Sequence, residues 1–119
     1  MARKILLECA FLIPVRRDRN LADGKLHHRS AWDWLEDSLL PFEGGTRDTA
    51  PTEGWYPDPD TGERVWDRSR RYVVALARKR VDELRAVLRQ ACRVFRQKSI
   101  YLSVAGHVEF IEGPSDEEE

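Results

Sequence analysis

The chain has 119 residues, of which 41% are hydrophobic and 34% are charged, and its formal net charge is −1. A chain of this size and composition folds as one domain around a single modest core, which excludes an intrinsically disordered chain. Its two cysteines are too few for a disulfide framework, so we expect buried thiols.

Charge is unevenly distributed along the chain. All 20 Lys and Arg lie in residues 1–98, whereas six of the 21 acidic residues lie in the last eleven. We predict a single domain over residues 1–112 and an acidic disordered tail over residues 113–119.

The N-terminal apolar run predicts a β-strand over residues 4–15. One face of this strand carries Ile5, Leu7, Cys9, Phe11 and Ile13, and the other carries Leu6, Glu8, Ala10 and Leu12. Because both faces are largely apolar, we expect a central strand. Glu8 interrupts the run, Arg16 and Arg17 follow it, and it is too short to cross a bilayer. We therefore expect a cytoplasmic protein without a secretion signal.

A polar loop and a short helix follow. Residues 16–29 are polar and contain an Asp-Gly turn signal. Ser30 is the expected N-cap of a helix over residues 31–40, which ends before Pro41. Its buried side would carry Leu35 and Leu39, with help from Trp34 or Trp32.

The stretch "GWYPDPDTGERVW" predicts a β-hairpin, because two aromatic flanks surround a turn of Pro, Asp and Gly. Its first strand would lie at the sheet margin over residues 46–57, where prolines are tolerated. Its second strand, over residues 65–77, would bury the segment "YVVALA".

The C-terminal third predicts a second helix over residues 78–97 and a last strand over residues 99–111. The buried stripe of the helix would consist of Val81, Leu84, Leu88, Ala91, Cys92 and Phe95. The core side of the strand would carry Ile100, Leu102, Val104, Val108 and Phe110. Its other side would carry Tyr101, Ser103, Ala105, His107, Glu109 and Ile111.

This order of elements predicts an α+β fold, the ferredoxin-like βαββαβ sandwich with two helices on one face of a four-stranded antiparallel sheet. In that arrangement the first and third strands are central and the last strand pairs with the first. The face without helices would be partly apolar, and such a surface marks an interface or a ligand site. Our preferred interpretation is a binding or assembly module that forms a homodimer through this open face.

An enzyme is the first alternative. His107 and Glu109 would project to the same side of the last strand, with Glu8 on the neighbouring strand. A histidine and two carboxylates suit acid/base or metal-assisted chemistry of a hydrolase or nuclease type. No second HxE, HExxH or CxxC motif accompanies them, so no metal or other cofactor is expected. His27 and His28 lie in a polar loop, where spare polar residues are more common than metal ligands.

Binding of nucleic acid or a nucleotide is the second alternative. The second helix carries an arginine stripe that suits an anionic ligand, formed by Arg85, Arg89, Arg93 and Arg96. On the sheet, Tyr101 and Ser103 are further candidate ligand contacts. The sheet lacks the paired aromatic motif of RNA-recognition domains.

The hairpin motifs Gly54-Trp55 and Thr61-Gly62, together with Phe95 and Gln97 before the last strand, resemble those of a family of small bacterial domains of unknown function. The likeness extends over most of residues 5–111. It implies a ferredoxin-like fold, no established activity and no catalytic residue.

Overall fold

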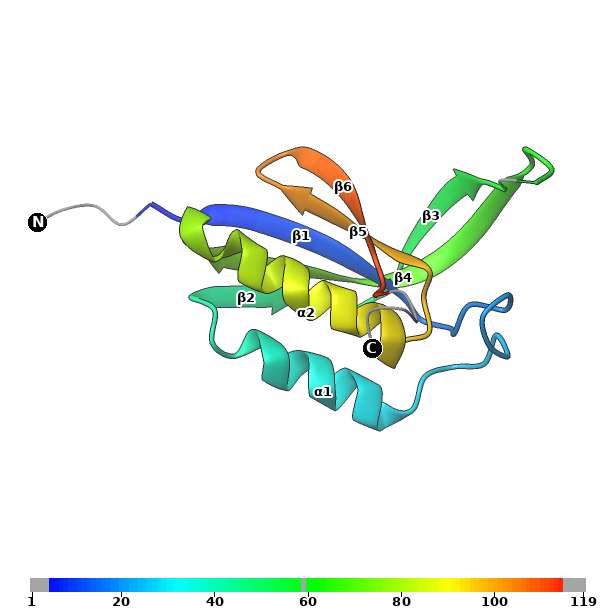
Figure 1. Ribbon diagram of the computed structural model, residues 1–119, viewed down its shortest axis with the longest axis horizontal. Coiled ribbons are helices and arrows are strands. Elements are labelled where there is room, and N and C mark those ends of the chain that lie inside the picture. The colour runs from blue at the N-terminus through cyan, green and yellow to red at the C-terminus, as the bar shows by residue number, and fades with distance from the viewer. Residues whose placement is uncertain (1–4, 59, 115–119) are drawn as a thin grey trace, which may run out of the picture.

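The apolar first strand lies at the centre of the sheet. In the computed structural model, which describes residues 5–58 and 60–114, β1 (Leu7–Pro14) pairs antiparallel with β4 (Arg64–Leu76) and β5 (Ser99–Val104). Helices α1 (Arg29–Leu39) and α2 (Val81–Val94) both cover one face of this sheet (Figure 1). A short 3-10 helix, η1 (Arg78–Arg80), leads into α2.

The alternation predicted for β1 is confirmed in its interior. Cys9, Phe11 and Ile13 face the helices and are fully buried. Ile5, which we expected on the same face, precedes the strand and is 78% exposed. Lys4, the first residue of the predicted strand, lies outside the described residues. Burial on one face and pairing on both edges make β1 the frame on which the other elements assemble.

The predicted edge strand over residues 46–57 is in fact two strands. β2 (Gly44–Arg47) pairs with one half of β4, and β3 (Thr52–Pro57) pairs with the other half. Pro51, which has no backbone N–H, lies between the two strands and cannot continue a ladder. The predicted hairpin itself is confirmed by the register, which places Trp55 opposite Trp66. Pro59, in its turn, lies outside the described residues.

The predicted last strand over residues 99–111 is wrong, because it folds back on itself. β5 ends at Val104 and β6 (His107–Glu112) returns beside it, with Val104 opposite His107. The two turn residues, Ala105 and Gly106, have φ angles of 48° and 89°. Two successive positive φ angles characterise the type I′ turn, whose twist matches that of the flanking strands.

Because of this turn, each residue after Gly106 lies on the face of the sheet opposite to the predicted one. Val108 and Phe110, predicted for the core, are 51% and 65% exposed, while Ile111 is buried. His107 and Glu109 consequently lie on the helix side of the sheet, because paired residues of antiparallel strands share a face.

The α+β class and the two helices on one face are confirmed, whereas the four-stranded ferredoxin arrangement is wrong. The sheet has six strands in the order β2-β4-β1-β5-β6, with β3 attached to β4 outside this path. As expected, β1 and β4 are neighbours and β5 pairs with β1. The additional strands arise from the two turns that the predicted strands did not include.

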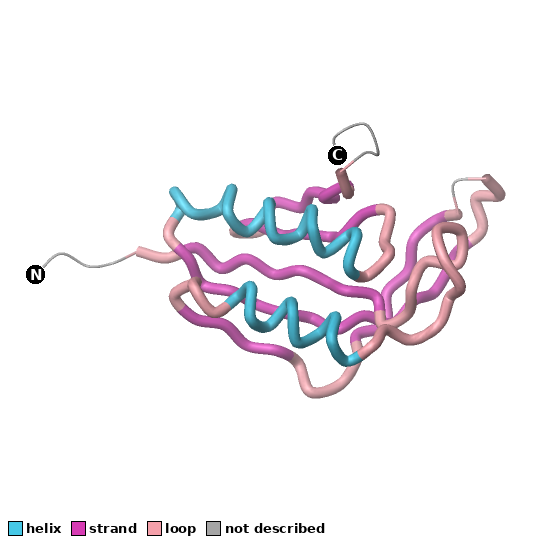
Figure 2. Tube along the Cα trace, turned by 60° about the horizontal axis from the view of Figure 1, so that its bottom comes forward, coloured by secondary structure: helices cyan, strands magenta, loops and turns pink. Residues whose placement is uncertain are grey.

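The helices follow their predicted stripes with shifted ends. All six residues predicted for the buried stripe of α2 are buried, and α1 buries Trp32 and Leu35. The N-cap of α1 is His28 and not Ser30, since the His28 carbonyl accepts the N–H of Ala31. The helices lie side by side across the sheet (Figure 2). Within the described residues, neither helix is long and apolar enough to cross a membrane.

The predicted boundary between domain and tail falls next to a packed residue. Gly113 lies so close to α2 that an added Cβ would be 2.9 Å from the Cys92 Cβ. Residues 115–119 of the predicted acidic tail lie outside the described residues.

The β5–β6 turn provides a test of this register. We expect Gly106→Ala to lower the free energy of unfolding by about 1 kcal/mol, because a Cβ is unfavourable at a positive φ. Ala105→Asn should raise the same free energy by roughly 0.5 kcal/mol, since Asn tolerates this conformation. Urea unfolding measures both changes. Gly54→Ala is the control, because Gly54 also has open space at its Cβ position but no positive φ. An unstable Gly54→Ala together with a neutral Gly106→Ala would contradict the turn.

Candidate functional site on the open face of the sheet

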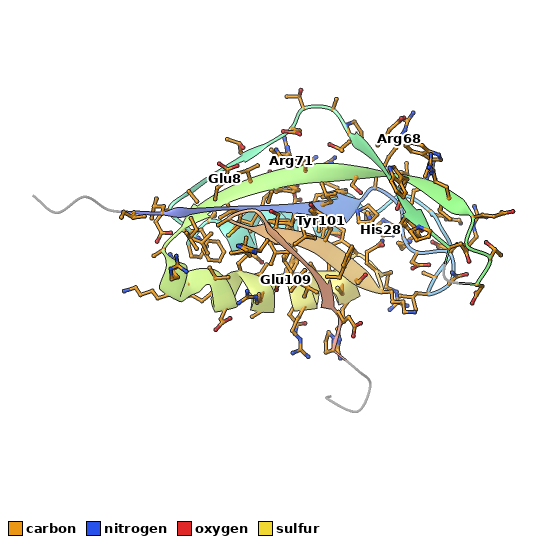
Figure 3. All side chains as sticks on the ribbon, turned by 90° about the horizontal axis from the view of Figure 1, so that it is seen from above. Glu8, His28, Arg68, Arg71, Tyr101 and Glu109 are labelled. Carbon is orange, nitrogen blue, oxygen red and sulfur yellow. The ribbon has the colours of Figure 1, made fainter. Side chains whose placement is uncertain are left out.

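In the part of the chain that the structure describes, no helix packs on the face of the sheet opposite α1 and α2 (Figure 1). The register identifies the residues that share it. Those that matter for the site are Glu8, Ala10 and Leu12 of β1, Arg71, Val73 and Ala75 of β4, Tyr101 and Ser103 of β5, and Val108 and Phe110 of β6. Figure 3 views this face from above, with Glu8, Arg71 and Tyr101 labelled. We call this set of residues the open face.

An aromatic pair occupies one end of the open face. The rings of Tyr101 and Phe110 meet edge to face, with their centroids 5.9 Å apart. Leu12 of β1 is the cross-strand partner of Tyr101, and it extends the apolar surface of the open face toward β4. Phe110 is exposed and Tyr101 is half-buried, and two rings in this arrangement offer both a face and an edge to a planar ligand ring.

Polar groups lie around the apolar centre of the open face, and one of them lies within it. Glu8, an exposed carboxylate, lies four residues before Leu12 on β1, which corresponds to roughly 13 Å along the strand. Ser103 lies opposite Ala10 in the middle of the face. Arg71 lies opposite Leu12, and its Nη1 is 3.7 Å from Oδ1 of Asp48. Ion pairs this long and this exposed are weak, so the Arg71 guanidinium can be drawn to a ligand at little cost.

Three of the residues proposed from the sequence therefore share one face, namely Glu8, Tyr101 and Ser103. Arg71 and Phe110 complete the open face but were not among the candidates. Arg71 has the same parity on its strand as Val73 and Ala75, so strand periodicity alone would have found it. Phe110 was missed because the turn before it reverses the parity.

The predicted trio of His107, Glu109 and Glu8 does not assemble, because Glu8 lies on the opposite face of the sheet. Glu109 instead accepts two hydrogen bonds from Arg85 of α2, at 2.7 Å from Nε and 3.0 Å from Nη2. These hydrogen bonds lower the pKa of the Glu109 carboxyl below its ordinary value. His107 is exposed beside the turn. Glu109 therefore links β6 to α2 through the Arg85 side chain. The predicted catalytic role of Glu109 stays a prediction.

The arginine stripe lies on the helix layer, away from the open face. Arg85 is held by Glu109 and by Asp82, whose Oδ1 lies 2.8 Å from Nη1. Arg89 and Arg93 are exposed on α2, and Arg96 follows the end of that helix. The structure therefore does not bring these arginines to Tyr101 and Ser103, and nucleic-acid binding by them stays a prediction.

The two loop histidines lie near the helix layer and do not reach the open face. Nε2 of His27 is 2.7 Å from the Pro14 carbonyl, and the imidazole meets the rings of Trp32 and Phe95 edge to face. Burial lowers the pKa of His27, so its neutral form is favoured. Among residues 5–58 and 60–114, no group of three or more His, Cys, Asp or Glu side chains is placed to hold a metal ion.

Sequence comparison and fold comparison give different results. No protein-family model and no curated protein sequence matches this chain. Two solved structures match its fold, both of phage SAM lyase. One contains S-methyl-5′-thioadenosine and has a TM-score of 0.65, 14% identity and coverage of 95% of both chains. The other, without ligand, has a TM-score of 0.61, 12% identity and coverage of 97% of both chains.

These matches correct two predictions. The resemblance to small bacterial ferredoxin-like domains of unknown function is wrong, because the fold that matches nearly the whole chain is that of phage SAM lyase. The preferred interpretation as a homodimeric assembly module is wrong as well, since the matching structures are those of an enzyme.

The pair between Arg85 and Glu109 predicts a pH-dependent contribution to stability. Because the folded-state pKa of Glu109 lies below 4.5, its contribution is complete above that pH and is lost as the pH falls through the folded-state value. We expect Glu109→Gln to lower the free energy of unfolding at pH 7 by about 0.5 kcal/mol, a small value because both side chains are partly exposed. The difference from the unchanged protein should shrink below pH 4.5. Urea unfolding at pH 7 and pH 3 measures it.

Glu112→Gln is the matched control, because Glu112 is an exposed glutamate on the same strand. Equal effects of the two substitutions at both pH values would show that the Arg85 contact contributes nothing.

Proposed function

We propose that this protein binds S-adenosylmethionine (SAM) on the open face and cleaves it, with release of S-methyl-5′-thioadenosine. The observation that supports this most is the fold match over 95% of both chains to a SAM lyase in complex with that compound. The composition of the open face provides independent support.

The open face offers a partner for each part of SAM. The adenine ring is planar and stacks on aromatic side chains, which Tyr101 and Phe110 supply. The amino-acid end of SAM carries an ammonium and a carboxylate, which suit Glu8 and Arg71. Arg71 lies two strands from Tyr101, roughly 10 Å across the sheet, so a ligand of nucleoside length spans the two.

The apolar centre of the face suits the sulfonium. Release of S-methyl-5′-thioadenosine breaks the bond between sulfur and the γ-carbon of the amino-acid chain, and the electron pair moves to sulfur, which loses its positive charge. A carboxylate at the sulfur would stabilise the charged substrate more than the transition state and would slow the reaction. Apolar contacts do not have this effect. We therefore place the sulfur over Ala10, Leu12 and Val73, and assign Glu8 to the ammonium, which keeps its charge throughout.

The lyase reaction needs no water and no cofactor. Either the carboxylate oxygen of the substrate forms a bond to the γ-carbon, which gives a lactone, or a proton passes from the neighbouring β-carbon to solvent and the C–H electrons form the double bond of an unsaturated amino acid. In both routes the bonding electrons of the broken bond remain on sulfur. Arg71 bound to the carboxylate would orient that group and would weaken it as a nucleophile, so identification of the four-carbon product distinguishes the routes.

Incubation of the purified chain with SAM tests the proposal directly. We expect chromatography to show time-dependent release of S-methyl-5′-thioadenosine. Tyr101→Ala should lower kcat/KM about tenfold or more, because loss of one stacking ring weakens the binding of a base by roughly 1–3 kcal/mol. Glu8→Gln should raise KM more than it lowers kcat, since the ammonium contact is the same in substrate and transition state.

His107→Ala is the control, because His107 lies on the opposite face of the sheet. Loss of activity in this variant with full activity of Tyr101→Ala would contradict the placement of the site. The absence of both product release and calorimetric binding of S-methyl-5′-thioadenosine at millimolar concentration would contradict the function itself.

A further inference from the structure

A cavity of about 530 Å³ lies at one end of the helix layer, away from the open face. Its walls come from the loop between β1 and α1, the first turns of α1 and the residues at the end of α2, which Figure 1 shows gathered at the same end of the molecule. The lining residues that matter for its chemistry are Arg17, His28, Trp34, Val94 and Arg96. Its volume lies within the range of small-molecule sites.

The walls of the cavity are fixed to one another. The Gln97 side chain, which is buried, donates a hydrogen bond to the Arg16 carbonyl at 2.8 Å. The N–H of Asp18 donates to the Arg96 carbonyl at 3.0 Å. These contacts bind the loop after β1 to the end of α2. A ligand would therefore enter a site that is already formed, without a large cost for ordering it.

Arg96 has an unfavourable backbone conformation at the rim of the cavity. Its φ is 51°, and the N–H groups of Arg96 and Gln97 donate to the carbonyls of Arg93 and Cys92. This pair of hydrogen bonds ends many helices, and the residue at the position of Arg96 is usually glycine. An arginine here reduces stability relative to glycine, and such departures are concentrated at functional positions.

The charge that the cavity presents to a ligand is positive. Its acidic residue, Asp23, is already occupied by Arg17, whose Nε lies 2.8 Å away, and by the N–H of Lys25. Arg96, in contrast, is exposed, and within residues 5–58 and 60–114 its side chain has no hydrogen bond or ion pair. His28, which also lines the cavity, adds a ring N–H donor.

The remaining wall of the cavity is apolar. The half-buried ring of Trp34 lies beside Ala31 and Val94. An indole ring next to small side chains favours a planar ring, which can stack on it.

We propose that this cavity binds a small organic anion that combines a planar ring with a phosphate, the chemistry of a nucleoside monophosphate. Arg96 and His28 meet the phosphate, and Trp34 meets the ring. The site is separate from the open face and does not depend on the proposed cleavage of SAM.

Calorimetry on the full chain with 5′-AMP as the probe tests the proposal, with adenosine and inorganic phosphate as separate ligands. We expect 5′-AMP to bind at least ten times more tightly than either. Arg96→Gly should weaken 5′-AMP at least tenfold and at the same time raise Tm by about 3 °C, because glycine relieves the positive φ. A variant that is more stable and binds less cannot owe its lost affinity to misfolding.

Two control variants distinguish binding in this cavity from a general effect of charge and from binding on the open face. Lys98→Ala removes the same charge from an exposed position two residues away and should change the affinity less than twofold. Tyr101→Ala, which alters the open face, should leave 5′-AMP binding intact. The proposal is overturned if 5′-AMP does not bind, if phosphate alone binds as tightly, if Arg96→Gly binds normally, or if Tyr101→Ala abolishes binding.

Discussion

The fold depends on the burial of β1. This strand has hydrogen-bonding partners along both edges, and its side chains Cys9, Phe11 and Ile13 are completely excluded from solvent beneath the helices. A strand in this position cannot shift by one residue, because a shift would move the three apolar side chains to the opposite face and bring Glu8 into the core. The register of β1 therefore fixes the registers of β4 and β5, and with them the composition of the open face.

The two faces of β1 differ in how much they contribute to the core. The helix face stabilises the molecule, and Phe11 stacks on Tyr72 there, with their ring centroids 5.3 Å apart. The open face contributes less to the core and leaves Leu12 and Ala10 half-buried on the face that carries the Tyr101 ring. A small domain that places its helices on one side of a sheet gains a broad second surface without additional chain. The SAM site that we propose lies on this surface and not in a deep pocket.

Periodicity predicted the parts of the fold in which one long pattern continues without a break. The alternation in β1 and the stripe from Val81 to Phe95 identified buried residues correctly, because a buried face leaves a direct trace in the sequence. The failure at residues 99–111 has a specific cause. Alternation continues through Ala105 and Gly106 as if the strand were unbroken, and Ala-Gly lacks the Asn or Asp that usually indicates a type I′ turn.

The turn between β5 and β6 also determines which residues of the site could be predicted from the sequence. Residues before it, Tyr101 and Ser103, were placed on the correct face, whereas His107 and Glu109 after it were not. The contact of Glu109 with Arg85 depends on the packing of α2 against β6, and no local pattern reports such a long-range ion pair. The likeness to the fold of phage SAM lyase was likewise found from the three-dimensional structure, because no family model and no curated sequence matches the chain.

The uneven pairing of β4 has a consequence for local opening of the chain. From Ser69 onward β4 is held by β1, and the Arg68 carbonyl accepts the N–H of Val15, whereas residues 64–67 pair with β3 alone in the described part of the chain. An isolated two-stranded ribbon is marginally stable in water. The Arg64 guanidinium lies 4.7 Å from the centre of the Trp55 ring, which adds only a modest attraction at an exposed site. Amide hydrogens of this ribbon should therefore exchange with solvent long before those of β1, and the ribbon can open while the core stays closed.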